Sequence, residues 1–125
     1  MPLVRDPVTE KVIGCAIEVH RTLGPGLLES VYEQCMAREL TLHSIPFRLQ
    51  VPVPVHYKGT DLDCGYRIDL LINDQVLVEL KSVERLSPIH DAQLLTYMKL
   101  AKIDTGLLIN FNSTRLVDGV RRFKN

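Results

Sequence analysis

The sequence predicts a fold of the α/β or α+β class, a three-layer sandwich in which a mixed central sheet of four to five strands is flanked by helices. Three observations support this prediction. Apolar residues at helical spacing come first, segments with a period of two follow, and a third helical segment precedes a short apolar run. The expected element order is α-α-β-β-β-α-β, with a further strand at the C-terminal end.

The length and the charge balance limit the classes of protein to consider. A chain of 125 residues is expected to form one domain, over residues 1–125. Fifteen basic residues balance fifteen acidic ones, which argues against a protein that coats nucleic acid with a strongly basic surface. A locally basic groove remains compatible with this balance.

The cysteines and the apolar runs bear on the compartment. Cys15, Cys35 and Cys64 are odd in number and far apart, which indicates free thiols in a reducing compartment and no metal-ligand spacing. The N-terminal segment lacks the apolar region of a secretory signal, and no run reaches the roughly 18 apolar residues of a membrane helix. We therefore expect a cytoplasmic protein without a membrane segment.

Two helices are expected in the N-terminal third of the chain. The first begins at Asp6-Pro7, because aspartate caps a helix and proline fits its first position, and it ends at Gly24-Pro25. The second follows Gly26 and ends before Ile45-Pro46, because a residue that precedes proline avoids helical angles. Its apolar stripe is expected to comprise Leu28, Val31, Tyr32, Cys35 and Met36.

The following segment has the alternation of strands. Residues 48–57 alternate in polarity, which predicts one strand with a buried face, and Pro52 and Pro54 place this strand at the edge of the sheet. A turn is expected at Lys58-Gly59-Thr60. Two further strands are expected at residues 66–72 and 76–82.

The C-terminal part contains a third helix and one or two strands. Ser87 and Pro88 predict the start of the helix, and Leu94, Tyr97, Met98 and Ala101 form its apolar stripe. Residues 106–111 are nearly all apolar, which is typical of a central strand covered on both faces. Residues 116–123 are expected to form a last strand, interrupted at Gly119.

Three charged residues interrupt strands that are otherwise apolar: Asp69, Glu79 and Lys81. Asp69 faces Glu79 only if three residues, 73–75, form the loop between the strands, whereas a two-residue loop would place Glu79 on the other face. In the first register the two Cβ atoms lie about 5 Å apart. Such a pair of carboxylates persists when a cation lies between them, and two carboxylates with waters commonly hold Mg²⁺.

A second interpretation needs no metal. Glu79 could instead form a cross-strand ion pair with Lys81 and Arg67 on a solvent-exposed face of the sheet. Glu29 likewise has two interpretations, as a site residue or as an acid that the dipole favours in the first turn of a helix. Tyr32 lies on the apolar stripe, which favours a place in the core.

Several motifs together resemble a known family. The residues Asp69, Glu79 and Lys81 resemble the D-x(n)-E-x-K core of the PD-(D/E)XK nuclease superfamily, which includes restriction endonucleases and RecB-type exonucleases. Residues 26–32 (GLLESVY) match the G-x-x-E-x-x-Y signature of a family of small proteins within that superfamily. Gln93 and Tyr97 match the Q-x-x-x-Y element of RecB-like members. The resemblance extends over roughly residues 5 to 123 and implies a restriction-endonuclease-like core.

The resemblance implies roles for individual residues. Asp69, Glu79 and Glu29 would be metal ligands at a catalytic centre, with Mg²⁺ or Mn²⁺ as the cofactor. Lys81 would act near the attacking water. Gln93 and Tyr97, four residues apart on one helix face, would bind substrate or support the site. Ile68 stands where the motif has proline, a departure that is common in the superfamily.

Two functions follow from the sequence. The first is a metal-dependent nuclease that hydrolyses phosphodiester bonds of nucleic acid, with DNA as the expected substrate. The second is a nuclease-fold module that binds nucleic acid or protein without turnover, which the zero net charge favours. A chain this small would surround a duplex only together with a partner chain, and that partner could be a second copy in a homodimer. A third possibility, a small-molecule hydrolase on an unrelated α/β fold, has little support, because the sequence contains no G-x-S-x-G and no P-loop.

Overall fold

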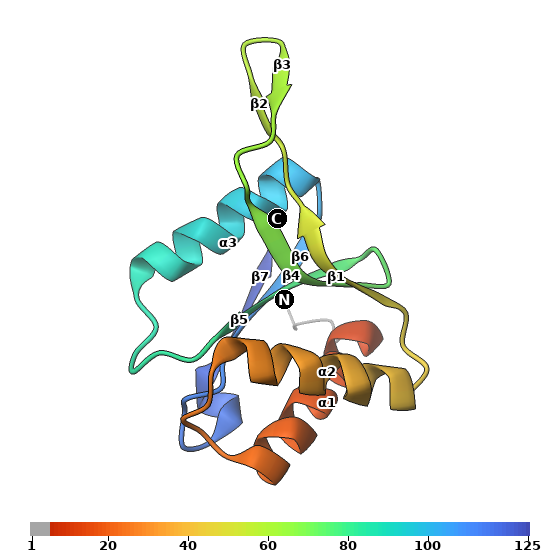
Figure 1. Cartoon of the computed structure of the whole chain (residues 1–125), viewed down its shortest axis with the longest axis vertical. Helices are drawn as coiled ribbons and strands as arrows, with labels where there is room; N and C mark the ends of the chain where they lie inside the picture. Colours follow the sequence, from red (N-terminus) through yellow and green to blue (C-terminus); the bar gives the residue numbers. More distant parts are fainter. Residues whose placement is uncertain (1–5) are drawn as a thin grey trace, which may run out of the picture.

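The computed structural model describes residues 6–125, and residues 1–5 of the expected domain lie outside the described residues. The elements are α1 (Pro7–Leu23), α2 (Glu29–Leu42), β1 (Phe47–Pro52), β2 (Val55–Tyr57), β3 (Thr60–Leu62), β4 (Arg67–Ile72), β5 (Val76–Lys81), α3 (Pro88–Ala101), β6 (Thr105–Asn110), the 3-10 helix η1 (Leu116–Gly119) and β7 (Val120–Lys124). Five strands form one sheet in the order β1-β4-β5-β6-β7, and β2 pairs with β3 in a hairpin that projects from the body (Figure 1).

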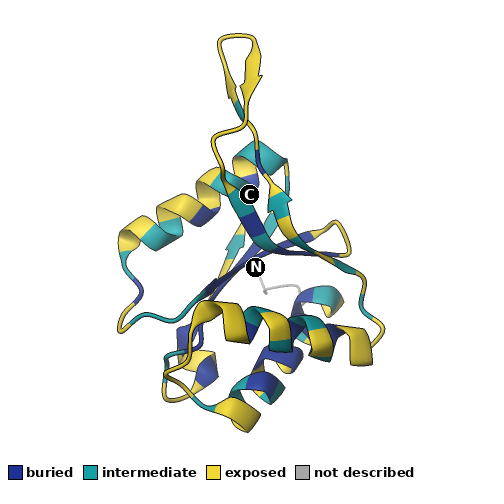
Figure 2. Ribbon diagram, in the orientation of Figure 1, coloured by how far each residue is buried: buried dark blue, intermediate teal, exposed yellow. Residues whose placement is uncertain are grey.

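The sheet is mixed and lies between two helical layers. β5 and β6 are parallel and are connected through α3, whereas the other neighbouring strands are antiparallel. One apolar cluster joins α1 and α2 to one face of the sheet, and a second cluster joins α3 to the other face. The inner strands are accordingly buried, while the projecting hairpin is exposed (Figure 2). The predicted three-layer sandwich with a mixed sheet is confirmed.

The helix starts follow the predicted capping chemistry. The side chain of Asp6 accepts a hydrogen bond from the backbone N–H of Val8 at 3.0 Å. Ser87 caps α3, and its backbone N–H donates to Nδ1 of His90 at 3.0 Å. Pro88 follows as the first helical residue. Because these groups satisfy backbone donors that the helices cannot pair internally, both starts can be recognised in the sequence.

The apolar stripe predicted for the second helix is wrong at Leu28 and at Val31, which is 38% exposed. The buried face of α2 consists of Tyr32, Met36 and Leu40, whereas Leu28 is 74% exposed. Leu28 precedes the helix in an extended conformation, with φ −69° and ψ 150°. Helical spacing therefore does not apply to it, and its side chain does not join the buried face.

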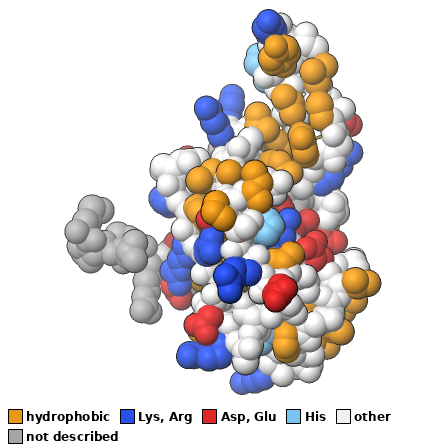
Figure 3. All heavy atoms as spheres, turned by 90° about the vertical axis from the view of Figure 1, so that its left-hand side faces the viewer, with side chains coloured by type: hydrophobic (Ala, Val, Ile, Leu, Met, Phe, Trp, Pro, Cys, Tyr) orange, Lys and Arg blue, Asp and Glu red, His pale blue; other side chains and the backbone are white. Residues whose placement is uncertain are grey.

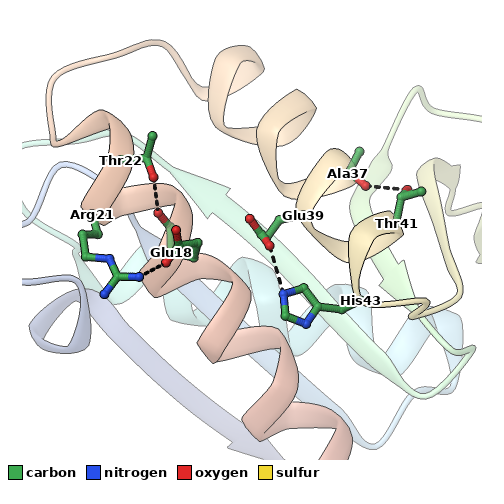
Figure 4. Close-up of polar contacts among 7 residues, drawn as sticks. All are labelled: Glu18, Arg21, Thr22, Ala37, Glu39, Thr41 and His43. Atoms are coloured by element: carbon green, nitrogen blue, oxygen red, sulfur yellow. Dashed lines mark hydrogen bonds and ion pairs between the residues drawn. The ribbon is translucent and has the colours of Figure 1, made fainter.

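Local polar contacts lie along α1 and α2 (Figure 4). Arg21 pairs with Glu18 in α1, and His43 pairs with Glu39 at 2.9 Å at the end of α2. The Oγ1 atom of Thr41 donates to the carbonyl of Ala37 at 2.8 Å. Each of these contacts stays within one helix and its end, so the apolar cluster carries the packing of α1 against α2.

The strand predicted at residues 48–57 is in fact two strands. β1 lies at the edge of the sheet, as the prolines predicted, but it ends at Pro52. The backbone N–H of Val53 still donates to the carbonyl of Tyr66 at 3.0 Å, whereas Pro54 has no N–H to continue the ladder. Beyond it, β2 pairs with β3, a strand that the sequence did not predict, through a two-residue turn with positive φ at Lys58 and Gly59.

The last predicted strand also begins later than expected. Residues Leu116–Gly119 form η1, and β7 starts at Val120 and pairs antiparallel with β6. Gly119 lies so close to the end of β6 that a Cβ atom added to it would be 2.5 Å from the carbonyl oxygen of Asn110. Only glycine fits this close approach, at the point where η1 ends and β7 begins. Across residues 6–125, none of the helices combines the length and the apolar character needed to cross a membrane.

Candidate active site

The pairing of β4 with β5 determines the geometry of the predicted site. The paired residues are Leu70 with Val78, Leu71 with Leu77 and Ile72 with Val76, which is the predicted register with a three-residue loop. Asn73 and Asp74 in that loop both have φ of 53°, the left-handed conformation that asparagine and aspartate tolerate. The next pair in this register is Asp69 with Glu79.

The regular backbone pairing stops before that pair, and the two carboxylates bind the backbone of the opposite strand instead. The N–H of Asp69 donates to Oε1 of Glu79 at 3.3 Å. The N–H of Leu80 donates to Oδ2 of Asp69 at 2.8 Å. The orientation of both carboxylates is therefore determined by the sheet itself.

Gln50 of β1 lies beside Asp69 and has an unusual backbone. Its φ is 51°, and it interrupts the ladder between β1 and β4, where Leu49 pairs with Leu70 and Val51 with Ile68. The apolar side chains of β1 consequently pack on α1 and α2 before Gln50 and on α3 after it. Nε2 of Gln50 donates to Oδ1 of Asp69 at 3.4 Å and to Oε1 of Glu33.

Burial and the charges of neighbouring acids disfavour the charged forms of both carboxyls. Glu79 is only 8% exposed, and burial followed by the charge of Asp69 raises the pKa of Glu79 from 4.5 to about 8. Burial also raises the pKa of Asp69, against the lowering effect of the N–H of Leu80. Two buried carboxyls with raised pKa values form a donor set of oxygens that a hard divalent cation would stabilise as anions.

Lys81 lies close to the two acids without pairing with them. Its charge lowers the pKa of both Asp69 and Glu79. Among the ion pairs within 4.0 Å in residues 6–125, none includes Lys81 or Glu79, and Arg67 pairs with Asp63 at 3.4 Å. The alternative of a surface ion pair between Glu79, Lys81 and Arg67 is therefore wrong. Its premise, a solvent-exposed face of the sheet, does not hold, because helices cover both faces.

Glu29 is the first residue of α2 and points toward the end of β5. Its Oε1 atom accepts a hydrogen bond from the backbone N–H of Ser82 at 3.3 Å. The hydroxyl of Ser82 donates to the carbonyl of Leu27 at 2.5 Å, so the start of α2 is attached to the sheet. A pocket of about 170 Å³ connects this region to the sheet, and its lining comprises Glu29, Ser30, Glu33, Gln50, Asp69 and Leu80.

The glycine and the tyrosine of the G-x-x-E-x-x-Y pattern shape the connection that carries Glu29. The hydroxyl of Tyr32 donates to the carbonyl of Gly24 at 2.7 Å and accepts from the N–H of Leu27 at 3.1 Å. Its ring stacks on Phe111 with centroids 4.4 Å apart. Gly26 has φ of 95°, which favours glycine. Tyr32 is thus a fully buried core residue that holds the loop.

The two residues of the Q-x-x-x-Y pattern differ in their places. Tyr97 of α3 is half-buried beside Tyr66, and burial followed by the charges of Glu79, Tyr66 and Asp69 raises its pKa. Gln93, one turn earlier, is exposed, and its side chain makes no hydrogen bond with another of residues 6–125. The structure therefore brings Tyr97 to the carboxylates, while Gln93 lies on the surface of the same helix.

Sequence reasoning missed Glu33, Gln50 and Tyr66. Glu33 could have been found, because it lies four residues after Glu29 and so on the same helix face. Gln50 and Tyr66 had no local signal. No group of three or more His, Cys, Asp or Glu side chains within residues 6–125 is arranged to hold a metal ion.

Comparison with known proteins agrees with this geometry. The profile of the family described as the PD-(D/E)XK nuclease superfamily matches residues 6–123, a range that includes every predicted site residue. No curated protein and no solved structure matches the chain. The match covers nearly the whole chain and coincides with a mixed sheet that carries Asp69, Glu79 and Lys81 on adjacent strands. The chain therefore belongs to the PD-(D/E)XK nuclease superfamily.

Proposed function

We propose that this protein is a metal-dependent nuclease that hydrolyses phosphodiester bonds of nucleic acid, with DNA as the substrate and Mg²⁺ or Mn²⁺ as the cofactor. One observation carries the proposal: Asp69 and Glu79 face each other across β4 and β5, with Lys81 on the face of Glu79, in a chain of a nuclease superfamily. The buried carboxylates and the neighbouring ammonium group are the residue types that such hydrolysis requires.

The carboxylates of Asp69 and Glu79 would hold the cation, and Glu29 would contribute directly or through a water molecule. When bound, a divalent cation lowers the pKa of a water and offsets the charge of the phosphate. The backbone N–H groups of Asp69 and Leu80 keep the two carboxylates in position. The docking of Ser82 on Leu27 keeps the start of α2, and with it Glu29, beside the end of β5.

Lys81 would position the attacking water and stabilise negative charge that develops on the phosphate. It lies two residues after Glu79, so both side chains emerge from the same face of β5. Tyr97 would support the site from α3, and Gln93 would contact substrate from the exposed side of that helix. The narrower G-x-x-E-x-x-Y family, a cytoplasmic location and a homodimer belong to the same proposal, and the loop held by Gly26 and Tyr32 supports the first of them.

The test is cleavage of single-stranded, duplex and branched DNA by the purified chain with Mg²⁺ or Mn²⁺. We expect cleavage that Asp69→Asn abolishes together with Mn²⁺ binding in calorimetry. Lys81→Met should retain Mn²⁺ binding and lose about 100-fold or more in rate, because it removes only the charge near the reacting atoms. Asp74→Asn, a change on the exposed loop between the same strands, is the matched control.

Failure to cleave any of these substrates, combined with no Mn²⁺ binding, would contradict the proposal. If the chain binds DNA without cleaving it, and Asp69→Asn binds equally well, the alternative of a binding module is favoured.

A further inference from the structure

We propose that Tyr66 and Tyr97 form a stacking platform for an unpaired nucleobase beside the carboxylates, so that the substrate is single-stranded DNA or an unpaired end of a duplex. This inference rests on the proposed nuclease function, because that function supplies the nucleic acid. It assigns a binding role to Tyr66, a residue outside the motifs that carry the resemblance.

The two rings lie against each other, and Tyr66 is the more exposed of the two residues. Their centroids are 5.6 Å apart with an interplanar angle of 49°. Tyr97 is half-buried on α3, where it packs against the apolar cluster of that face, whereas Tyr66 remains 45% exposed. Tyr97 thus supports Tyr66 from within, and the exposed part of Tyr66 is available to a ligand.

The backbone under Tyr66 is fixed. Its carbonyl accepts hydrogen bonds from the N–H of Val53 at 3.0 Å and from Nη1 of Arg67 at 2.8 Å. Tyr66 immediately precedes β4, in the segment that connects β3 to β4. A ring held in place before binding loses little conformational entropy when a base stacks on it.

The platform lies near the reacting centre. Tyr66 comes three residues before Asp69, which is about 10 Å along an extended strand. The charges of Glu79 and Asp69 act on Tyr97 itself. A base stacked on Tyr66 would consequently belong to a nucleotide close to the phosphate that the carboxylate site would engage.

Charge makes stacking an important source of affinity here. The formal net charge is zero, and several basic side chains are engaged in ion pairs with acids of this chain: Arg21, Arg48, Arg67, Arg121 and Arg122. On the face in Figure 3, acidic and basic side chains are interspersed, and hydrophobic side chains follow the projecting hairpin. Binding of nucleic acid through its phosphates alone normally uses many Lys and Arg side chains that are not paired with acids. Stacking on an aromatic ring contributes roughly tenfold in affinity per base.

Stacking on Tyr66 requires a base with a free face. Within a continuous duplex both faces of each base are covered by its neighbours, and exposing one has an unstacking penalty. A single strand, or an end with an unpaired base, avoids that penalty. The platform therefore selects unpaired substrates over continuous duplex.

The test measures binding of the full chain to a short DNA strand that carries a fluorescent adenine analogue, with Ca²⁺ in place of Mg²⁺. Stacking on a ring quenches the analogue, and gel analysis confirms that the strand stays intact. We expect Tyr66→Leu to weaken single-strand binding about tenfold and to abolish the quenching, and Tyr66→Phe to retain both within about twofold. Binding of a covalently closed duplex circle, in which every base is stacked on both faces, should not change. Tyr57→Leu, at an exposed tyrosine of the projecting hairpin, is the matched control and should bind as the unaltered chain.

Equal single-strand affinity of Tyr66→Leu and the unaltered chain would overturn the inference, and so would equal losses for single strand and duplex. Cleavage by the unaltered chain with Mn²⁺, measured in parallel, separates this inference from the proposed function. Cleavage that does not depend on Tyr66 overturns the platform and leaves the nuclease. Binding that depends on Tyr66, without any cleavage, supports the platform and overturns the nuclease.

Discussion

The backbone N–H of Asp69 donates a hydrogen bond to Oε1 of Glu79 at 3.3 Å, across the point where the regular pairing of β4 with β5 stops. Oδ2 of Asp69 in turn accepts from the N–H of Leu80 at 2.8 Å. These bonds hold two acids together in a buried place. Two full charges about 4 Å apart repel by about 4 kcal/mol at an effective dielectric of 20. The arrangement therefore disfavours the doubly ionised state unless a cation is bound.

Asp69→Asn should stabilise the metal-free protein although it removes the proposed metal binding. Asparagine has the same shape, and its Oδ1 atom can still accept from the N–H of Leu80, while the repulsion with Glu79 disappears. We expect a gain of about 1 kcal/mol in the free energy of unfolding, measured by urea denaturation in the presence of a chelator.

The same variant should lose the stabilisation that Mn²⁺ gives to the unaltered chain, since only a ligand that binds the folded state raises its stability. Asp74→Asn is the control, because Asp74 is exposed in the loop between the same strands, and a change within about 0.5 kcal/mol is expected. A marked loss of stability in Asp69→Asn without metal would show that the carboxylate is held for a structural reason.

The stability of the metal-free protein should fall as the pH rises. The pKa of Glu79 is raised from 4.5 to about 8, first by burial and then by Asp69. Above pH 4.5 the unfolded chain releases a proton that the folded state keeps, so the free energy of unfolding decreases with pH until the pH passes about 8. The pKa of Asp69 is also raised, so this residue contributes to the same decrease.

If one proton is released, the free energy of unfolding falls by at most about 1.4 kcal/mol per pH unit. Urea denaturation across this pH range measures it, and Glu79→Gln serves as the reference because it removes the titrating group. The difference in the free energy of unfolding between Glu79→Gln and the unaltered chain should shrink when Mn²⁺ is added. A difference that stays constant, or grows in favour of the unaltered chain with rising pH, would show that Glu79 is ionised in the folded state.

Tyr32→Phe should destabilise the fold by about 1–2 kcal/mol. The lost hydroxyl donates to the carbonyl of Gly24 and accepts from the N–H of Leu27. The ring and its stacking on Phe111 remain, so the change isolates the hydrogen bonds that hold the loop before Glu29. Urea denaturation gives the loss, and hydrogen exchange of the Leu27 amide should accelerate more than that of the core strands. Unchanged protection of Leu27 would mean that the docking of Ser82 on Leu27 suffices to hold the loop.

Gly106→Ala should destabilise the protein by about 1–3 kcal/mol. A Cβ atom at Gly106 would lie 2.5 Å from Sδ of Met98, whose side chain is fully buried between α3 and β6. Gly14→Ala provides the opposite control. Gly14 lies inside α1 with no atom within 4 Å of an added Cβ, and alanine should stabilise that helix by about 0.5–1 kcal/mol. Thermal denaturation of both variants checks the pair, and similar melting temperatures would contradict the packing argument.

Much of the fold was predictable because its signals are local. Asp6, Ser87 and Pro88 act on helix starts within their own neighbourhood, and the apolar run of residues 106–111 fits only a strand covered on both faces. The two possible registers of Asp69 against Glu79 could be stated for the same reason, and the structure has the one with the three-residue loop. The register depends on the loop between two adjacent strands, which are close in the sequence.

The errors occur where a distant segment decides the outcome. The strand predicted over residues 48–57 divides at Pro54, because β2 pairs with β3 and not with the sheet. Leu28 has the spacing of a buried helix residue, but α2 begins after it. In both cases the residues have the expected alternation or spacing. The element that would bury them, the main sheet for β2 and the helix for Leu28, does not extend to those residues.

By itself, the sequence determined the class of the fold, the starts of the first and third helices, and that Glu79 and Lys81 emerge from the same face of one strand. Only the tertiary structure decided that Gln50 lies beside Asp69, that Glu29 is attached to the end of β5 through Ser82, and that Tyr66 meets Tyr97. These contacts join segments far apart in the chain. Local capping and alternation constrain neighbouring residues, whereas the pairing of β1 with β4 and the packing of α3 on the sheet depend on the whole apolar core.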